Sequence, residues 1–452
     1  MTSPEFAEEV FADLELLRAR DPRGLLPAVA GAGAQVRETA RLTAEAGLGR
    51  VTEGGRPRGL VIVARREGAV AASVLRALLG PSSPVTVDVV PGPTLPVWTG
   101  PSDIVVVATR TGAGAYAVTP AYEAARRGVS LLGIGAEGAP LHVACSSARA
   151  PYVALPASRV RHTTLWSLLT PMLLLARELD LLPADAADPE TIAAALDEVA
   201  IECGPAQESF VNPAKTLALE LLDALPVIAA EGPLAGAAAT RIVDQLATLA
   251  GLPATGFRLP DQRVAACAVL GGPLAPRDTD DFFRDRADDP GRRLRLLTIR
   301  DTDGGGDDGA GEREPRSAAA AMDEVLRTAA GHNIPVSGLA EHGEPGRFAR
   351  LPHLARQLAV ADFSAVYLAL ALDNERALRT WPRTRRRPRP PRNTAAGMPE
   401  AVTAARRRSS PRSWPTSASP SRSSSPSSSP GPPRCWPRRS TRSPTPATRC
   451  CC

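Results

Sequence analysis

The sequence predicts an α/β protein with two domains, each built on a parallel sheet flanked by helices. Short apolar runs rich in β-branched residues alternate with segments of helical spacing, which is the pattern of parallel strands joined by crossover helices. This alternation occurs in both halves of the chain. The chain has 452 residues, of which 44% are hydrophobic, so it is long enough for two domains with cores of their own.

The first half of the chain divides into a helical segment, residues 1–50, and a first α/β domain, residues 51–183. The helical segment ends at Gly47 and Gly49, because glycine favours the end of a helix. The runs that follow are short and apolar, and the helices between them end at glycines. We predict strands at 59–64, 85–90, 102–109 and 129–135, and helices at 67–80 and 119–128.

The second half, residues 184–375, predicts a second α/β domain. Asn212 and Pro213 are residue types that open a helix as N-cap and first-turn residue. Lys215, the one lysine of the chain, comes third in this helix and is predicted to be exposed. The other elements show the same alternation as the first half. We predict strands at 226–232, 263–272 and 292–301, and helices at 212–225, 235–251, 317–331 and 349–372.

Residues 376–452 differ in composition from the rest of the chain. They contain 18 arginines and one acidic residue, whereas the rest contains 35 basic and 47 acidic residues. The acidic body excludes nucleic-acid binding through clustered cations, and the tail has too few apolar residues to fold. The tail is either a basic segment for nucleic acid or acidic partners, or the product of a shifted reading frame. We favour the second, because out-of-frame reading of GC-rich DNA yields arginine, proline and serine in bulk.

Several classes of site are disfavoured by the sequence. The N-terminus is acidic and lacks the pattern of a signal peptide, and Pro171 and the charges from Arg177 onward interrupt the most apolar stretch. We therefore expect a cytoplasmic protein without a membrane partner. The seven cysteines form no Cys-x-x-Cys pair, and the acidic, glycine-rich residues 300–316 lack the order of a calcium loop. We expect no metal, and a solvated loop at 300–316.

The stretch SDIVVVATRTGAGA, residues 102–115, predicts a ligand site. Its apolar run predicts a buried strand, and the small residues after it allow a ligand to approach the backbone closely. Ligands of parallel sheets bind beyond the carboxyl ends of the strands. The loop that begins at Thr109 is therefore the first candidate site of the chain.

Five motifs together resemble the bifunctional phosphoglucose/phosphomannose isomerase family. They are DPRGLL, TRTGAGA, VRHTTLW, CGPAQESFVNPAKTLALELLDALPVI and ADFSAVYLALAL, and the resemblance runs from about residue 21 to residue 372. It implies two flavodoxin-like sugar isomerase (SIS) domains and a hexose phosphate as ligand. It also implies a homodimer with the site between domains and subunits, and no cofactor.

The resemblance also implies the residues that hold the phosphate. In the family, a Ser-x-Ser-Gly-Asn-Thr loop follows the third strand, and here Thr109, Thr111 and Gly112 fall on its two serines and its glycine. Hydroxyls and the N–H groups of a helix N-terminus are suited to bind a phosphate. Gly68 falls on the serine of the family's second phosphate loop, and Arg161 falls on its first-domain catalytic cation.

The family's proton-transfer residues are not matched in this sequence. Its glutamate falls near Thr248 and its histidine near Val264, and its C-terminal lysine falls in the arginine-rich tail. Glu231, at the end of the 226–232 strand, and His162, beside Arg161, are the groups that could replace them as acid or base.

Two functions of different class therefore remain open. The first is a phosphosugar isomerase that interconverts glucose 6-phosphate or mannose 6-phosphate with fructose 6-phosphate. The second is a catalytically degenerate SIS protein that binds a phosphosugar and acts in regulation or as a scaffold. The missing glutamate and histidine favour the second function, and the overall resemblance favours the first.

Overall fold

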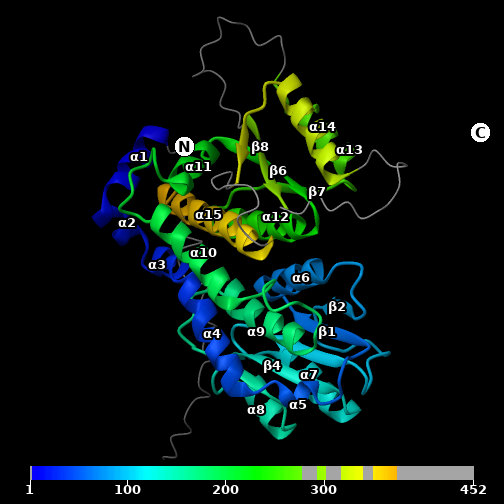
Figure 1. Ribbon diagram of the computed structural model, residues 1–452. Helices are drawn as coiled ribbons and strands as arrows, with labels where there is room; N and C mark the ends of the chain where they lie inside the picture. Colours follow the sequence, from blue (N-terminus) through cyan, green and yellow to red (C-terminus); the bar gives the residue numbers. More distant parts are fainter. Residues whose placement is uncertain (1–2, 277–292, 302–316, 340–349, 374–452) are drawn as a thin grey trace, which may run out of the picture. The chain divides into compact units, whose positions relative to one another are not determined.

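The structure is a computed structural model that describes residues 3–276, 293–301, 317–339 and 350–373 (Figure 1). Both sheets belong to one unit, Met1–Arg385. Residues 302–316 of the loop predicted at 300–316 and the basic tail lie outside the described residues, so the two interpretations of the tail stay untested.

The first sheet has five parallel strands in the order β2-β1-β3-β4-β5. Neighbouring strands pair in register, with Leu60 opposite Ile104 and Ile104 opposite Ser130. This strand order is the flavodoxin-like one, so the predicted fold class is confirmed. The strands are β1 (Gly59–Ala64), β2 (Thr86–Val90), β3 (Ile104–Ala108), β4 (Ser130–Ala136) and β5 (Tyr152–Leu155).

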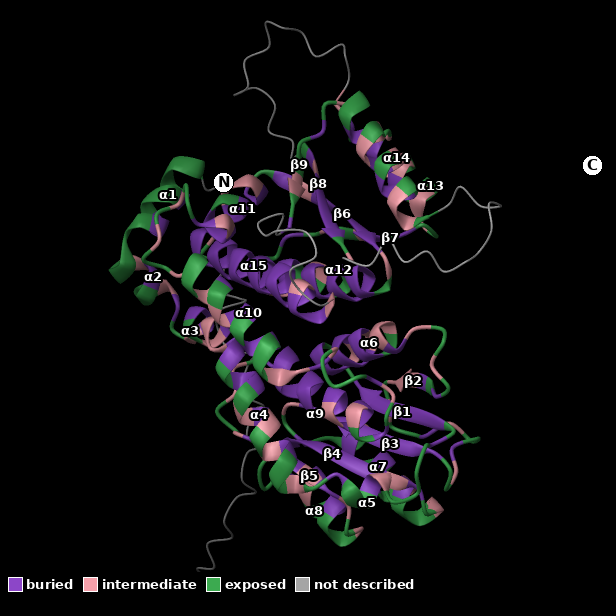
Figure 2. Ribbon diagram, viewed as in Figure 1, coloured by how far each residue is buried: buried purple, intermediate pink, exposed green. Residues whose placement is uncertain are grey.

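Helices cover both faces of this sheet, and Figure 2 shows its central strands as buried. Alternate residues of β1 enter different hydrophobic clusters, since Leu60 and Ile62 pack in one and Val61 and Val63 in the other. This is the period-2 geometry of a strand that is buried on both faces. The helices of the first cluster are α6 (Glu67–Leu79) and α9 (Leu165–Glu178), and those of the second are α7 (Ala115–Arg127) and α8 (Pro140–Ser147).

The second sheet has four parallel strands in the order β7-β6-β8-β9. They are β6 (Ala224–Glu231), β7 (Thr255–Leu259), β8 (Arg293–Arg300) and β9 (Val336–Gly338). Its helices are α12 (Pro233–Gln245), α13 (Arg263–Leu270), α14 (Ala318–Gly331) and α15 (Arg350–Ala371), and a π-helical turn, Leu246–Ala250, continues α12. Helix α12 packs against α6, so the two α/β units share one continuous hydrophobic core.

The remaining helices lie mostly in the N-terminal segment and between the two sheets. The predicted start at Asn212 is confirmed, because its side chain accepts hydrogen bonds from the N–H groups of Ala214 and Lys215. These helices are α1 (Pro4–Ala12), α2 (Leu14–Arg20), α3 (Leu25–Ala30), α4 (Ala32–Ala46), α5 (Gly49–Thr52), α10 (Pro189–Glu202) and α11 (Pro213–Leu221).

Two predictions about the second half are wrong. The run at 263–272 is helix α13 and not a strand, because a short apolar run without alternation fits a helix equally well. The strand of this region is β7, whose sequence TGFRL has a glycine and an arginine among five residues and so lacks a strand signal. The second error concerns Lys215, which is 1% exposed and not a surface residue.

Of the helices described, α15 is the one long and apolar enough to cross a membrane, and it is fully buried inside the protein. The core helix of a globular protein has the same composition, and α15 packs against α10, α11 and α12.

Candidate functional site

A pocket of about 300 Å³ lies at the carboxyl ends of β1 and β3. This is the position at which open α/β sheets bind their ligands. The structure brings together here five of the predicted site residues, which come from three separate loops. The lining consists of Arg65, Arg66, Glu67, Gly68, Thr109, Arg110, Thr111, Tyr116, Arg161, His162 and Leu168.

The loop after β3 supplies hydroxyl groups to the pocket. The Thr109 hydroxyl lies 2.6 Å from the Tyr116 hydroxyl, and Thr111 is exposed. Gly112 does not line the pocket but shapes the loop, because it has a φ of 59° and a Cβ there would lie 2.5 Å from the Ala139 Cβ. Helix α7 begins at Ala115, so its free N–H groups end at this loop.

The loop after β1 brings helix α6 close to the sheet. A Cβ on Gly68 would lie 3.1 Å from the Ala108 carbonyl oxygen and 3.1 Å from the Ala64 Cβ, so a small residue is needed there. Arg66 before it has a φ of 52°, and His162 across the pocket has a φ of 73°. A positive φ costs a non-glycine residue roughly 1–3 kcal/mol, and residues with such strained backbone conformations cluster at ligand sites. The backbone therefore also indicates that this pocket is functional.

Four arginines give the pocket a positive charge. None of Arg65, Arg66, Arg110 and Arg161 makes an ion pair with another residue that the structure describes. Burial, and then the charge of Arg161, lower the pKa of Arg110. Unpaired guanidinium groups are donors suited to phosphate and carboxylate oxygens. The pocket is therefore built to bind an anion.

Two of these arginines have fixed positions. Arg65 lies over the Tyr116 ring, 4.7 Å from its centroid, and its Nε donates to the Pro91 carbonyl oxygen at 2.6 Å. Arg110 donates to the Arg159 carbonyl oxygen at 3.3 Å.

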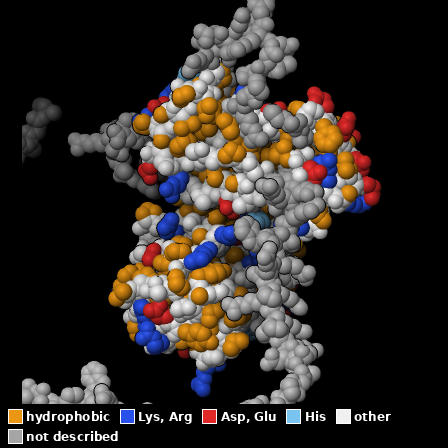
Figure 3. Space-filling model, turned by 180° about the vertical axis from the view of Figure 1, so that it is seen from behind, with side chains coloured by type: hydrophobic (Ala, Val, Ile, Leu, Met, Phe, Trp, Pro, Cys, Tyr) orange, Lys and Arg blue, Asp and Glu red, His pale blue; other side chains and the backbone are white. Residues whose placement is uncertain are grey.

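Figure 3 shows basic side chains with a histidine gathered near the middle of one face of the molecule. The sequence analysis missed Arg65, Arg66 and Arg110, although they adjoin predicted positions.

Glu67 is the one acidic residue in the lining, and its carboxylate is already engaged. One oxygen accepts from the Thr164 N–H at 2.8 Å, and the other accepts from the Thr164 hydroxyl at 2.7 Å. Arg241 lies 3.7 Å from the first oxygen. The Glu67 carboxylate therefore fixes Thr164, and the nearby Arg241 offsets part of the negative charge that would repel an anion.

His162 is neutral at pH 7. Burial lowers its pKa to about 4, and the charges of Arg161, Arg66 and Arg241 act in the same direction against the opposing effect of Asp244. A neutral imidazole has one nitrogen free to accept a proton. His162 is thus available as a base in a pocket whose charged groups are otherwise arginines and one engaged carboxylate.

The low pKa of His162 makes the stability of the protein pH-dependent. Between about pH 6.5 and pH 4 the unfolded chain holds the proton and the folded chain does not, so stability is lost as the pH falls through this range. We expect the His162→Gln variant to lose less Tm than the wild type between pH 7 and about pH 4.5. The control is His142→Gln on α8. Equal losses in the wild type and His162→Gln would contradict the assigned environment of His162.

Glu231 does not line this pocket. It lies at the end of β6 in the second sheet, 5% exposed, with Arg300 Nε at 3.7 Å. Burial raises its pKa, and Arg300 opposes this. The family's glutamate falls near Thr248, whose hydroxyl donates to the Asp244 carbonyl oxygen. Its histidine falls near Val264, which is 68% exposed. The role of Glu231 as a base stays an untested prediction.

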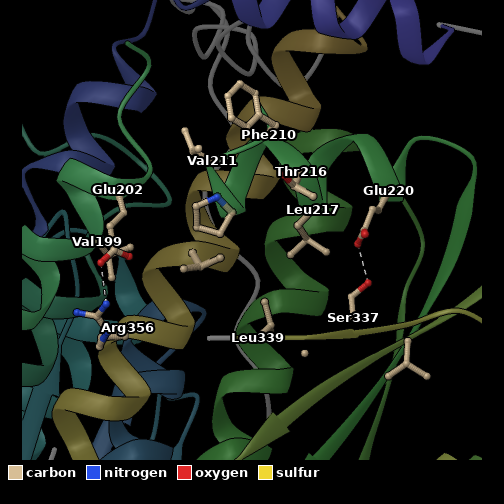
Figure 4. Close-up of a pocket in the computed structure, with 14 residues that line it drawn as sticks. Val199, Glu202, Phe210, Val211, Thr216, Leu217, Glu220, Ser337, Leu339 and Arg356 are labelled. Carbon is tan, nitrogen blue, oxygen red and sulfur yellow. Dashed lines mark hydrogen bonds and ion pairs between the residues drawn. The ribbon is translucent and has the colours of Figure 1, made fainter. Parts of the chain in front are cut away.

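A second pocket of about 500 Å³ lies between α10, α11, β9 and α15 (Figure 4). Its lining is mainly apolar, and Phe210 and Val211 are exposed at it. Its charged groups are paired, since Arg356 bonds to Glu202 at 2.9 Å and Glu220 accepts from Ser337 at 2.6 Å. This pocket therefore offers less to a phosphate than the arginine-lined pocket of the first sheet.

Residues 210–375 match the family described as the bacterial phospho-glucose isomerase C-terminal SIS domain. A hypothetical protein from Thermus thermophilus is 14% identical, with a TM-score of 0.51 over 81% of this chain and 90% of that chain. A protein assigned as a tagatose-6-phosphate ketose/aldose isomerase, from Clostridium novyi NT, is 12% identical, with a TM-score of 0.50 over 80% and 93%. Structures at these identities show the fold alone. A comparison with curated proteins finds no match.

The two parallel sheets and their strand orders define an α/β protein with flavodoxin-like sheets. The family match in the second half agrees with the resemblance carried by the sequence motifs. The similarity to the C-terminal SIS domain of bacterial phospho-glucose isomerase covers residues 210–375 of the 452-residue chain.

Proposed function

We propose that this protein binds a hexose phosphate in the arginine-lined pocket and interconverts its aldose and ketose forms. Glucose 6-phosphate, mannose 6-phosphate and fructose 6-phosphate are the proposed substrates. The observation that carries the proposal is the meeting of Thr109, Thr111, Arg161 and His162, which come from separate loops, in one pocket with unpaired cations. A cytoplasmic homodimer is part of the same proposal.

In this proposal the phosphate lies at the loop after β3. The hydroxyls of Thr109 and Thr111 and the N–H groups at the start of α7 hold its oxygens, with Arg110 beside them. The sugar then extends toward the segment that carries Arg161 and His162. The lining also includes Tyr116, whose hydroxyl is paired with Thr109.

The reaction requires a proton to move between C1 and C2 of the open-chain sugar. His162 takes the proton from one carbon and returns it to the other, a hydroxyl proton passes between O1 and O2, and the Arg161 guanidinium stabilises the enediolate oxygen. The phosphate dianion neutralises part of the arginine field that lowers the pKa of His162, so binding makes this imidazole a stronger base. The alternative is a protein that binds the phosphosugar without chemistry.

Solvent deuterium exchange tests the proposal. Each hexose 6-phosphate is incubated in D₂O with the full chain, and proton NMR measures deuterium at C1 and C2. We expect exchange above a heat-killed control, and a loss of about a hundredfold or more in the His162→Gln variant. Arg161→Gln should also slow exchange, whereas Arg76→Gln, on α6 but outside the pocket, should leave it unchanged.

The outcomes separate the two functions. Line broadening of the sugar phosphate without exchange would favour the binding protein over the isomerase. Neither broadening nor exchange would contradict both. Full exchange in His162→Gln would place the base elsewhere, and Glu231→Gln would then be the next variant.

A further inference from the structure

We propose that Arg241 and Gln245, on α12 of the second domain, are positioning residues for the pocket of the first domain. They hold the segment 160–164, which carries Arg161 and His162, at the His162 carbonyl oxygen, whereas Glu67 holds it at Thr164. This inference rests on the proposed function, since it assigns these residues to the same phosphosugar site.

The segment 160–164 needs support because it has no regular secondary structure. It contributes two residues to the pocket, and one of them, His162, has a φ of 73°. Such a conformation persists only where the surrounding structure fixes it. The only bond within the segment that involves a side chain runs from the Thr163 hydroxyl to the Val160 carbonyl oxygen at 3.1 Å, within the part that the structure describes.

Two side chains of the second domain supply the support. The His162 carbonyl oxygen accepts from Arg241 Nη2 at 3.0 Å and from Gln245 Nε2 at 3.0 Å. A carbonyl oxygen has two lone pairs, so these two bonds use its full capacity. The peptide on the carboxyl side of His162 is thereby fixed in orientation, and with it the direction in which the imidazole enters the pocket.

Asp362 on α15 fixes both donors. Its carboxylate accepts from Arg241 Nε at 2.9 Å and Nη2 at 2.6 Å, and from Gln245 Nε2 at 3.1 Å. Gln245 Nε2 donates to both the His162 carbonyl oxygen and the Asp362 carboxylate. The Gln245 Oε1 is buried and has no partner among the described residues, so this amide serves as a donor. All three side chains are 5% exposed or less.

Arg241, Gln245 and Asp362 together are called the clamp below, and the clamp also contacts the first domain. Arg241 Nη1 lies 3.7 Å from the Glu67 carboxylate, which holds Thr164 at the other end of the segment. The segment is therefore held at His162 and at Thr164 by one connected network that spans both domains. None of the three second-domain side chains lines the pocket, which distinguishes positioning from catalysis.

The Gln245→Met variant tests the inference, because it keeps the volume of the side chain and removes both hydrogen bonds. We expect about tenfold weaker binding of fructose 6-phosphate, and a His162 imidazole that titrates at higher pH by NMR. Binding of inorganic phosphate, which the loop after β3 holds, should stay within about twofold. The matched control is Gln207→Met, which removes one bond to the Ile201 carbonyl oxygen away from the pocket.

A merely structural role for Gln245 would lower Tm and leave these readouts unchanged. Unaltered affinity for fructose 6-phosphate and an unaltered His162 titration in folded Gln245→Met would overturn the inference. Thr164→Val, which loosens the other end of the segment, should change both readouts in the same direction and serves if Gln245→Met does not fold. If the wild type binds no phosphosugar, the proposed function fails, whereas the His162 titration still tests the clamp.

Discussion

Replacing Asp362 by alanine is expected to lower the free energy of unfolding by about 3–5 kcal/mol, because it leaves the Arg241 guanidinium buried without its main partner. Arg241 is 3% exposed, and Asp362 accepts both of its shortest hydrogen bonds. The Glu67 carboxylate at 3.7 Å compensates only in part. Chemical denaturation of the full chain, followed by circular dichroism, measures the change.

The control for Asp362→Ala is a charge pair at the surface. Arg37 bonds to Glu190 and Asp197, and its side chain is 39% exposed. Exposed pairs contribute about 0–1 kcal/mol, so Arg37→Gln should cost no more than this. An effect of Asp362→Ala as small as that of Arg37→Gln would contradict the assignment of Asp362 as the partner that stabilises the buried charge. The double variant Arg241→Met with Asp362→Leu should recover part of the loss, since apolar side chains replace buried ion pairs at little cost.

The sequence could predict the sheets because their signal is local. Strands β1, β2 and β3 of the first sheet are short valine-rich runs. The four strands predicted for that sheet are confirmed, whereas β5, with the sequence YVAL, was not predicted. Strand β7 was missed because it is short and has no strand signal, and helix α13 was predicted as a strand because it is apolar without a clear period. Local sequence does not distinguish such a strand from such a helix. Which of the two conformations a segment adopts depends on how it packs on the second sheet.

The pocket could be predicted in part, because the resemblance placed Thr109, Thr111, Gly68 and Arg161. His162 was a candidate because it is the neighbour of Arg161 in the sequence. These residues meet because they follow parallel strands of one sheet. Right-handed crossover connections bring the loops at the carboxyl ends of such strands to the same edge of the sheet. A signal for the three missed arginines was present, because all of them lie in the loops that follow predicted strands.

The clamp on His162 could not be predicted. Arg241 and Asp362 are 121 residues apart, and each is one among many charged residues of a chain with 53 basic and 48 acidic side chains. Their pairing depends on how α12 and α15 pack, which is settled by the apolar faces of both helices. Glu231 lies at the end of β6 in the second sheet, as the sequence predicts, and its role as a base stays an untested prediction.

Lys215 carries the second prediction of large effect. Its ammonium group donates to the carbonyl oxygens of Phe11 at 2.8 Å, Pro205 at 2.9 Å and Gln207 at 2.7 Å. It also lies 5.7 Å from the centroid of the Tyr367 ring. Burial lowers its pKa to about 8, which leaves it charged at pH 7. This one side chain connects the N-terminal helices to the start of α11.

We expect Lys215→Met to lower the free energy of unfolding by roughly 3 kcal/mol or more. One buried and two half-buried carbonyl oxygens lose a charged donor, and each bond of this kind contributes roughly 1.5–3 kcal/mol before compensation. Chemical denaturation at pH 7 measures the loss. Thr216→Val, which removes one exposed bond to the Ser209 carbonyl oxygen, is the neighbouring control and should cost less than about 1 kcal/mol.

The single lysine also allows this burial to be tested without a variant. Lys215 is the one lysine side chain that an amine-reactive reagent can modify. In the folded protein it is 1% exposed and all three of its N–H groups are used, so mass spectrometry of the peptide that contains Lys215 should find modification only after denaturation. Equally fast modification of Lys215 in the folded and the denatured protein would mean that the ammonium group is accessible. The three carbonyl bonds would then be too weak to stabilise this region, and the expected cost of Lys215→Met would fall with them.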